Sequence, residues 1–158
     1  MKPDNKKILS VIGAIIFLVV LAGIQISFIN PFFIRLNLFL ILVLYLTLVK
    51  DNIRAIVFAW SGGILTGINS FSIFGINSLI LLIIAAVFII LGKTIFINLT
   101  TKSVLLVGVI GVLLYHLLNW ALTGNGSLSY FFNIGILTEL ILTVIALKIL
   151  LKIKTKNV

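Results

Sequence analysis

The chain has 158 residues, of which 62% are hydrophobic and 9% charged, and its mean hydropathy of +1.38 excludes an ordinary soluble domain of this length. A formal net charge of +9 would suggest nucleic acid as the partner of a soluble protein. Here the basic residues lie at the ends of apolar runs, so we expect anionic lipid headgroups as partner and no nucleic acid. The chain has no cysteine, which excludes disulfides, thiolate catalysis and cysteine-ligated metals.

Long apolar runs predict an all-α integral membrane protein with six transmembrane helices. A bilayer core about 30 Å thick needs roughly 20 apolar residues per helix, so six spans account for nearly the whole chain as one domain. Asn30-Pro31 ends the first span and starts the second. The first run has no clear A-x-A cleavage site, so we expect it to be retained rather than removed as a signal peptide. Within the domain, residues 1–158, the expected spans are 8–29, 32–49, 53–68, 74–91, 103–122 and 130–151.

Basic residues mark one side of the expected membrane. All of them except Arg35 lie before the first span, in or beside every second gap between spans, or in or beside the segment after the last span. Because Lys and Arg beside membrane spans stay in the cytoplasm, this pattern predicts that both termini are cytoplasmic. The clusters are Lys2, Lys6 and Lys7; Lys50 and Arg54; Lys93 and Lys102; and Lys148, Lys152, Lys154 and Lys156.

The third span carries a stripe of small residues at four-residue spacing, which places them on one face of a helix. Such a face lets another backbone approach closely, and in lipid this close packing replaces the hydrophobic gain that is missing there. The spacing favours packing within the chain and leaves contact with a second protein open. The stripe consists of Ala55, Ala59, Gly63 and Gly67.

Two ionisable residues fall inside the spans and away from their ends, His116 in the fifth and Glu139 in the sixth. At 1.5 Å per residue they lie roughly 9 Å and roughly 13 Å from the outer surface, so we expect that they can form a buried pair. Asn119 adds a polar group near them. One carboxylate and one imidazole do not make a complete proton relay, so a role in helix packing or partner binding is favoured.

The inventory of reactive residues predicts that the protein is not an enzyme and binds no metal or cofactor. The acids are Asp4, Asp51 and Glu139, and His116 is the single histidine. No catalytic triad or metal site can be assembled from these residues.

Three segments in the middle of the chain resemble the MreD family of rod-shape-determining membrane proteins: Asn37 to Tyr45, Gly62 to Leu65, and Ser70 to Leu79. The family's signature looks like G-L-x-x-D-x-x-S-x-x-x-x-G between its third and fourth spans. Laid on this sequence, it matches Gly63, Ser70 and Gly75. The chain departs from it at Gly67, where the family usually has an aspartate, so a partner contact made by that carboxylate is in doubt here.

The resemblance implies a multi-pass scaffold in the bacterial inner membrane. Its expected partners are an MreC-like bitopic protein, an MreB-like filament and cell-wall synthesis enzymes, and its expected role is to support peptidoglycan synthesis and cell shape. Gly63, Gly67 and the loop from Ser70 to Gly75 are the residues that we expect to serve as structure or partner contact.

The alternative is a substrate-binding subunit of an energy-coupling-factor vitamin transporter, which has a similar six-helix fold. Such subunits carry an A-x-x-x-A stripe on the first helix, whereas here Ala14 is followed by Leu18. His116, Asn119, Asn133 and Glu139 are the polar residues that could line a vitamin site. A third reading, a small proton-coupled transporter, would depend on Glu139.

Overall fold

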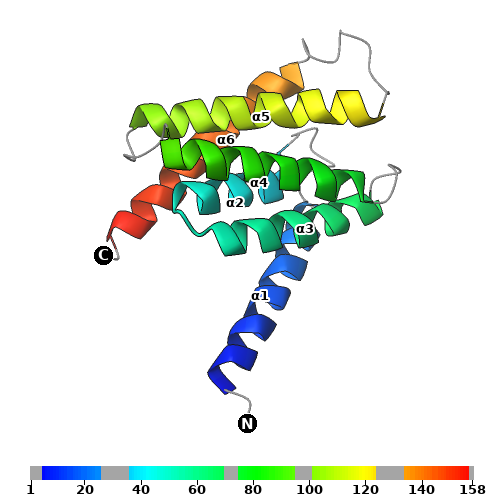
Figure 1. Ribbon diagram of the computed structural model, residues 1–158, viewed down its shortest axis with the longest axis vertical. Coiled ribbons are helices and arrows are strands. Elements are labelled where there is room, and N and C mark those ends of the chain that lie inside the picture. Colours follow the sequence, from blue (N-terminus) through cyan, green and yellow to red (C-terminus); the bar gives the residue numbers. More distant parts are fainter. Residues whose placement is uncertain (1–4, 26–35, 70–74, 95–100, 124–133, 157–158) are drawn as a thin grey trace.

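The computed structural model describes residues 5–25, 36–69, 75–94, 101–123 and 134–156. Over this part of the chain every regular element is an α-helix, so the all-α prediction is confirmed (Figure 1). The helices are α1 (Asn5–Ile24), α2 (Leu38–Leu48), α3 (Asn52–Asn69), α4 (Ile76–Thr94), α5 (Thr101–Thr123) and α6 (Ile134–Lys156).

The second helix is much shorter than the expected span 32–49. It begins at Leu38 because Asn37 is extended (φ −91°, ψ 96°) and its side chain accepts a hydrogen bond of 3.1 Å from the backbone N–H of Leu40. This is the geometry of an N-cap, which ends the helix on its N-terminal side. Residues 36 and 37, which the expected span includes, are therefore not helical, and this part of the prediction is wrong. Residues 26–35 lie outside the described part of the chain.

The other boundaries move by smaller amounts. Helix α1 begins three residues before the expected position 8, and α6 runs to Lys156 instead of residue 151. Helices α3, α4 and α5 begin or end within three residues of their expected bounds. At the end of α1, the side-chain oxygen of Gln25 accepts a hydrogen bond of 3.2 Å from the backbone N–H of Leu38, which links the first two helices.

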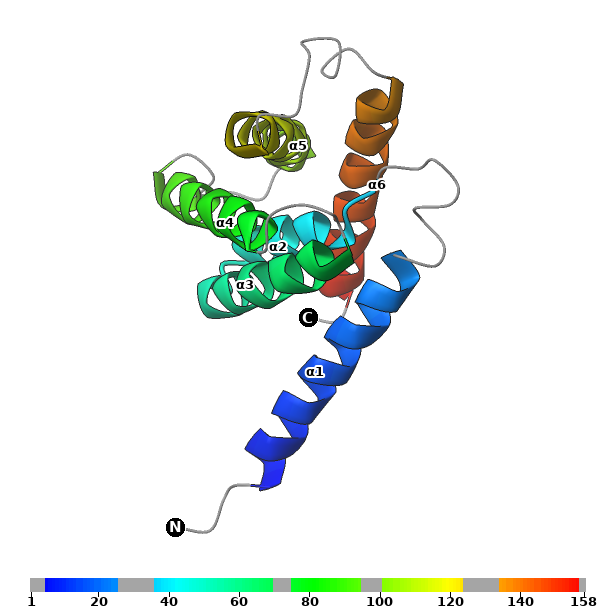
Figure 2. The ribbon, with the colours of Figure 1, turned by 90° about the vertical axis from the view of Figure 1, so that its right-hand side faces the viewer.

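Helix α2 lies at the centre of the fold, where it packs against α3, α4, α5 and α6 (Figure 2). Its residues are apolar on every side, which is typical of a helix that is surrounded by protein. Glycines on its neighbours make room for its large side chains. A Cβ at Gly62 on α3 would lie 2.3 Å from Cδ1 of Phe39, and one at Gly111 on α5 would lie 2.6 Å from Cδ1 of Leu44.

A tight turn joins α2 to α3. Lys50 has φ 63°, in the left-handed region that non-glycine residues seldom adopt. Asp51 then precedes α3, and its carboxylate lies 3.4 Å from Nε of Arg54 in the first turn of that helix. The turn lets the chain reverse within a few residues and brings α3 back along α2.

Helix α1 extends away from the other five helices instead of lying beside them (Figures 1 and 2). Among its described side chains, Leu18 and Ala22 are buried against the rest of the chain, and Phe17 meets Phe58 of α3 edge to face at 6.4 Å. Leu21 is partly buried against the core, whereas four other large side chains of this segment are exposed: Ile16, Val19, Val20 and Ile24. Helix α1 therefore lies partly outside the group that α2 to α6 form (Figure 2).

Within the described residues, one helix is long and apolar enough to cross a membrane by length and composition. This is α5, whose most apolar window has a mean hydropathy of 2.0 and is 33% buried. Three further stretches are apolar but shorter: Leu38–Leu48, Asn52–Ile68 and Ile76–Gly92. One helix of this kind does not by itself indicate a membrane protein, because the core helix of a soluble protein can be as long and as apolar.

Candidate functional site

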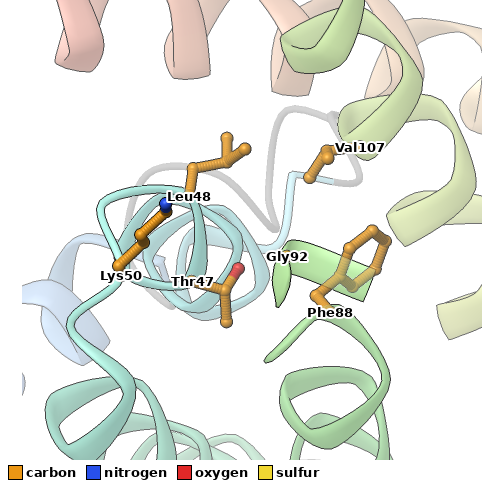
Figure 3. Close-up of a pocket in the computed structure, with 6 residues that line it drawn as sticks. All are labelled: Thr47, Leu48, Lys50, Phe88, Gly92 and Val107. Atoms are coloured by element: carbon orange, nitrogen blue, oxygen red, sulfur yellow. The ribbon is translucent and has the colours of Figure 1, made fainter. Parts of the chain in front are cut away.

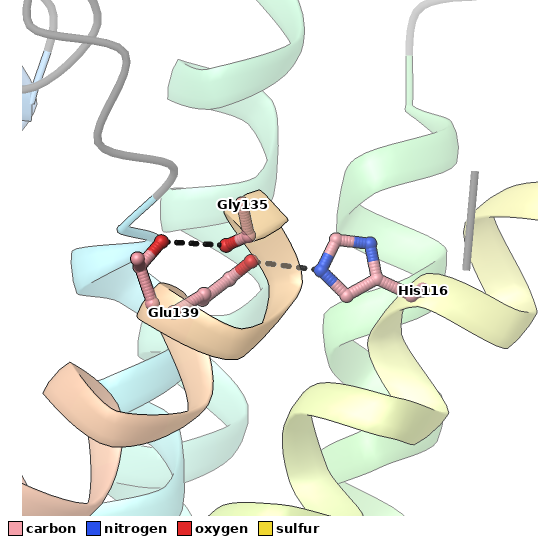
Figure 4. A network of polar contacts seen from close by, with 4 residues as sticks. His116, Gly135 and Glu139 are labelled. Carbon is pink, nitrogen blue, oxygen red and sulfur yellow. Dashed lines mark hydrogen bonds and ion pairs between the residues drawn. The ribbon is translucent and has the colours of Figure 1, made fainter. Parts of the chain in front are cut away.

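His116 and Glu139 meet between α5 and α6 in the interior of the protein (Figure 4). The imidazole Nε2 and the carboxylate Oε2 are 2.7 Å apart, and the two side chains are 4% and 2% exposed. An ionised carboxylate can only accept, so in that state the Nε2–H donates the hydrogen bond. The pair that the sequence suggested is thus present in the structure.

Small residues on α5 allow the two helices to approach closely enough for this contact. A Cβ at Gly108 would lie 2.8 Å from Cγ2 of Val144 on α6. Gly108 faces Val144, and His116, which is later in α5, contacts Glu139, which is earlier in α6. The two helices therefore run antiparallel. This register places one polar residue of each helix at the same level.

A third polar group lies on the buried face of α6, one helical turn beyond Glu139. Thr143 is 1% exposed, and its hydroxyl has no hydrogen-bond partner among the described residues. Residues four apart on a helix are neighbours on one face, so Thr143 belongs to the same polar region as the pair. We refer to His116, Glu139 and Thr143 as the polar cluster. Sequence reasoning missed Thr143, although its spacing from Glu139 was visible.

The polar cluster can do two things chemically. It can hold α5 and α6 together, because a buried carboxylate is costly unless it is hydrogen-bonded. It also offers an imidazole, a carboxylate and a hydroxyl to a polar ligand. The described residues contain no group of three His, Cys, Asp or Glu side chains that could hold a metal ion.

Asn119 lies on α5 about one turn after His116 and is only partly buried. Its backbone carbonyl accepts a hydrogen bond of 2.7 Å from the hydroxyl of Thr123. No described hydrogen bond joins its side chain to His116 or Glu139, so the structure does not bring this predicted site residue into the polar cluster. Asn133 lies outside the described residues.

The small-residue stripe of α3 is covered by the chain itself. Ala55, Ala59, Gly63 and Gly67 are all buried. At Gly63 a Cβ would lie 2.2 Å from Cα of Ser78, so α3 and the first turn of α4 touch backbone to backbone. The hydroxyl of Ser78 also donates a hydrogen bond to the backbone carbonyl of Trp60 on α3.

The loop that carries the rest of the resemblance is described only at its end. Ser70 lies outside the described residues. Gly75 precedes α4 with φ 91°, a conformation that glycine adopts without strain. Its carbonyl accepts a hydrogen bond of 3.0 Å from the backbone N–H of Leu79, so Gly75 starts the helix. A Cβ at Gly67 would lie 3.9 Å from the backbone nitrogen of Gly75, which is ordinary contact.

A small cavity lies where α2 and α4 end and α5 begins (Figure 3). Its volume of about 10 Å³ is close to the space that one water molecule needs. Such a cavity is far smaller than a site for a vitamin-sized ligand, for which several hundred Å³ are usual. The lining residues are Thr47, Leu48, Lys50, Phe88, Gly92 and Val107.

Comparison of the chain with protein-family models, with curated proteins and with solved structures finds no match.

Proposed function

We propose that the protein is a membrane scaffold subunit of the bacterial cell-elongation machinery, which binds an MreC-like bitopic partner and supports peptidoglycan synthesis and cell shape. The proposal combines the resemblance to the MreD family over Asn37 to Leu79 with the surface of the folded chain. It also includes a multi-pass location in the inner membrane.

The membrane location is supported by the apolar character of the surface. Large apolar side chains are exposed on α1, α3, α4, α5 and α6, whereas a carboxylate and an imidazole are buried. Soluble monomers seldom expose contiguous apolar areas beyond a few hundred Å². A surrounding lipid phase accounts for exposed Leu105, Leu113 and Leu117 on one helix without any further partner.

Six crossings with both termini in the cytoplasm are part of the same proposal, and they rest on the distribution of Lys and Arg along the sequence. Eleven residues of α2 extend for only about 16 Å, roughly half of the hydrocarbon thickness. Because α2 is surrounded by other helices, irregular backbone next to it can be shielded from lipid by protein.

The observation that carries the scaffold role is the exposed surface of α1. Its described part contacts the remaining helices through few side chains and leaves Ile16, Val19 and Val20 uncovered. A bitopic partner has one transmembrane helix, and the side of an isolated apolar helix is a surface on which such a helix can pack. We therefore place the partner contact on α1 and assign Ala55, Ala59, Gly63 and Gly67 to packing within the chain.

The test is affinity purification of the tagged full chain from native membranes in mild detergent, followed by mass spectrometry. Val20→Trp enlarges an exposed position on α1, and Leu113→Trp makes the same kind of change at an exposed position on α5. The proposal expects a bitopic partner and cell-wall synthesis enzymes with the unmodified chain and with Leu113→Trp, but not with Val20→Trp. Loss of the partner in both variants, or in neither, would remove α1 as the contact.

The polar cluster favours a second candidate function, the substrate-binding subunit of an energy-coupling-factor vitamin transporter. Its three buried polar groups could contact a ligand that opens the bundle. The first helix does not fit this candidate. Leu18 occupies the position where the docking stripe would have a small residue, and Leu18 is buried against the chain's own helices. Recovery of paired ATPases with a coupling membrane protein in the same purification would support this second function.

A further inference from the structure

We propose that one exposed face of α6 binds anionic phospholipid, with lysines near its C-terminal end that hold the headgroup and an apolar ridge that contacts the acyl chains. The inference rests on the membrane location proposed above, but not on the scaffold role. It assigns the lipid to one helix face, which we call the lipid face. The face consists of Leu137, Ile141, Ile145, Lys148, Ile149, Lys152 and Ile153.

The apolar ridge follows directly from the burial of α6. Leu137, Ile141, Ile145, Ile149 and Ile153 recur at four-residue spacing, and each is about half exposed or more. At 1.5 Å per residue this ridge extends for about 24 Å, which is most of the thickness of a bilayer core. The opposite side of the helix holds the buried residues Ile136, Glu139, Thr143 and Leu147.

The two lysines share the face with the ridge. At about 100° per residue, Lys148 and Lys152 project on the same half of the helix as Ile141, Ile145 and Ile149. Both lysines are exposed. The long apolar stem of a lysine lies along apolar surface while its ammonium group reaches the headgroups, so charges within an apolar ridge are placed for a lipid with an anionic head.

The charge balance selects an anionic headgroup over a zwitterionic one. The chain has twelve basic and three acidic residues. Of the described acids, Glu139 is buried on the other side of α6. Asp51 precedes α3, where its Oδ2 lies 3.4 Å from Nε of Arg54. No described acidic side chain therefore lies on the lipid face. An acidic protein surface could meet the lysines, but it would leave the apolar ridge without a matching surface, whereas a phospholipid satisfies both.

The experiment uses the full chain, purified in mild detergent and titrated with phosphatidylglycerol or with phosphatidylcholine of the same acyl chains. Native mass spectrometry counts the bound lipids. We expect tighter binding of phosphatidylglycerol, and about fivefold less preference for each lysine removed, so roughly 30-fold less in the Lys148→Gln/Lys152→Gln variant. Lys102→Gln, an exposed lysine at the start of α5, is the matched control and should keep most of the preference.

Equal binding of the two lipids by the unmodified chain would overturn the inference, and so would an unchanged preference in the double variant. Circular dichroism of each variant shows whether the helices are intact, and Ile145→Asn, which leaves both lysines in place, should weaken binding of both lipids alike. If the double variant keeps its lipid preference but loses a protein in affinity purification, the face belongs to an acidic partner and the lipid inference is wrong. Release of the chain from membranes by alkaline carbonate would instead contradict the proposed location.

Discussion

Glu139 on α6 and His116 on α5 form a buried hydrogen bond of 2.7 Å that joins two antiparallel helices in the interior of the protein. The contact joins Nε2 of His116 to Oε2 of Glu139, whereas the adjacent Thr143 hydroxyl has no hydrogen-bond partner among the described residues. This is a small polar centre in an otherwise apolar contact between helices. Substitutions in it should have different effects, because His116 and Glu139 are hydrogen-bonded to each other and Thr143 has no described partner.

Glu139→Ala should destabilise the protein by about 1 to 3 kcal/mol, because it leaves a buried imidazole donor without its acceptor. Glu139→Gln should have a smaller effect, since the amide oxygen can still accept from Nε2–H of His116. The measurement is thermal unfolding of the full chain in mild detergent, with each variant compared with the unmodified protein. Equal losses for Ala and Gln would mean that the charge, and not the hydrogen bond, holds the helices together.

Thr143→Val should leave stability unchanged or raise it by about 1 kcal/mol. The substitution keeps the shape of the side chain and removes a buried hydroxyl that has no hydrogen-bond partner among the described residues. The same unfolding measurement checks this expectation. A clear loss of stability would show that the hydroxyl is bonded in the protein, for example to a buried water molecule or a ligand.

Gly63→Ala should be strongly destabilising, with a loss of about 1 to 3 kcal/mol or more, because its Cβ would lie 2.2 Å from the Cα of Ser78. Backbone atoms cannot move aside as the end of a flexible side chain can. Gly23→Ala on α1 is the matched control, since a Cβ there would meet nothing within 4 Å. The control should be neutral or gain about 0.5 to 1 kcal/mol, the usual difference between Ala and Gly in a helix. Similar losses in both variants would contradict the close contact of α3 with α4.

Cysteine labelling of intact cells tests the proposed topology, because the chain has no cysteine of its own. Lys152→Cys lies near the C-terminal end of α6, and Leu122→Cys lies near the C-terminal end of α5. Because α5 and α6 run antiparallel, these two exposed positions lie at opposite ends of the helix pair. A membrane-impermeant maleimide should label Leu122→Cys in intact cells and Lys152→Cys only after the cells are opened. Labelling of Lys152→Cys in intact cells would reverse the predicted orientation.

The sequence predicted the helical class and most helix positions, because long apolar runs separated by polar residues indicate helices of about this length. It failed at the start of α2. Proline at position 31 indicated a first helical turn, whereas the capping side chain of Asn37 determines where α2 begins. The direction of α1 could not be predicted either, since it depends on which tertiary contacts form and not on the residues of α1 alone.

Part of the candidate site could be predicted from helix geometry alone. Depth along two neighbouring spans was enough to suggest that His116 and Glu139 can meet, because each helix rises by a fixed distance per residue. The same argument did not identify Thr143, which looks like any threonine in an apolar helix. For Gly63, spacing indicated a close contact but not its partner, and the first turn of α4 at Ser78 could be found only in the folded chain.

The scaffold role is tested most sharply by affinity purification of the tagged full chain from native membranes, with Val20→Trp on α1 and Leu113→Trp on α5 in parallel. If the protein is a scaffold, a bitopic coiled-coil protein and cell-wall synthesis enzymes should remain bound to the unmodified chain and to Leu113→Trp, and Val20→Trp should lose them. Recovery of paired ATPases and a coupling membrane protein, with no cell-wall synthesis enzymes, would contradict the scaffold role and make the protein a vitamin-capture subunit.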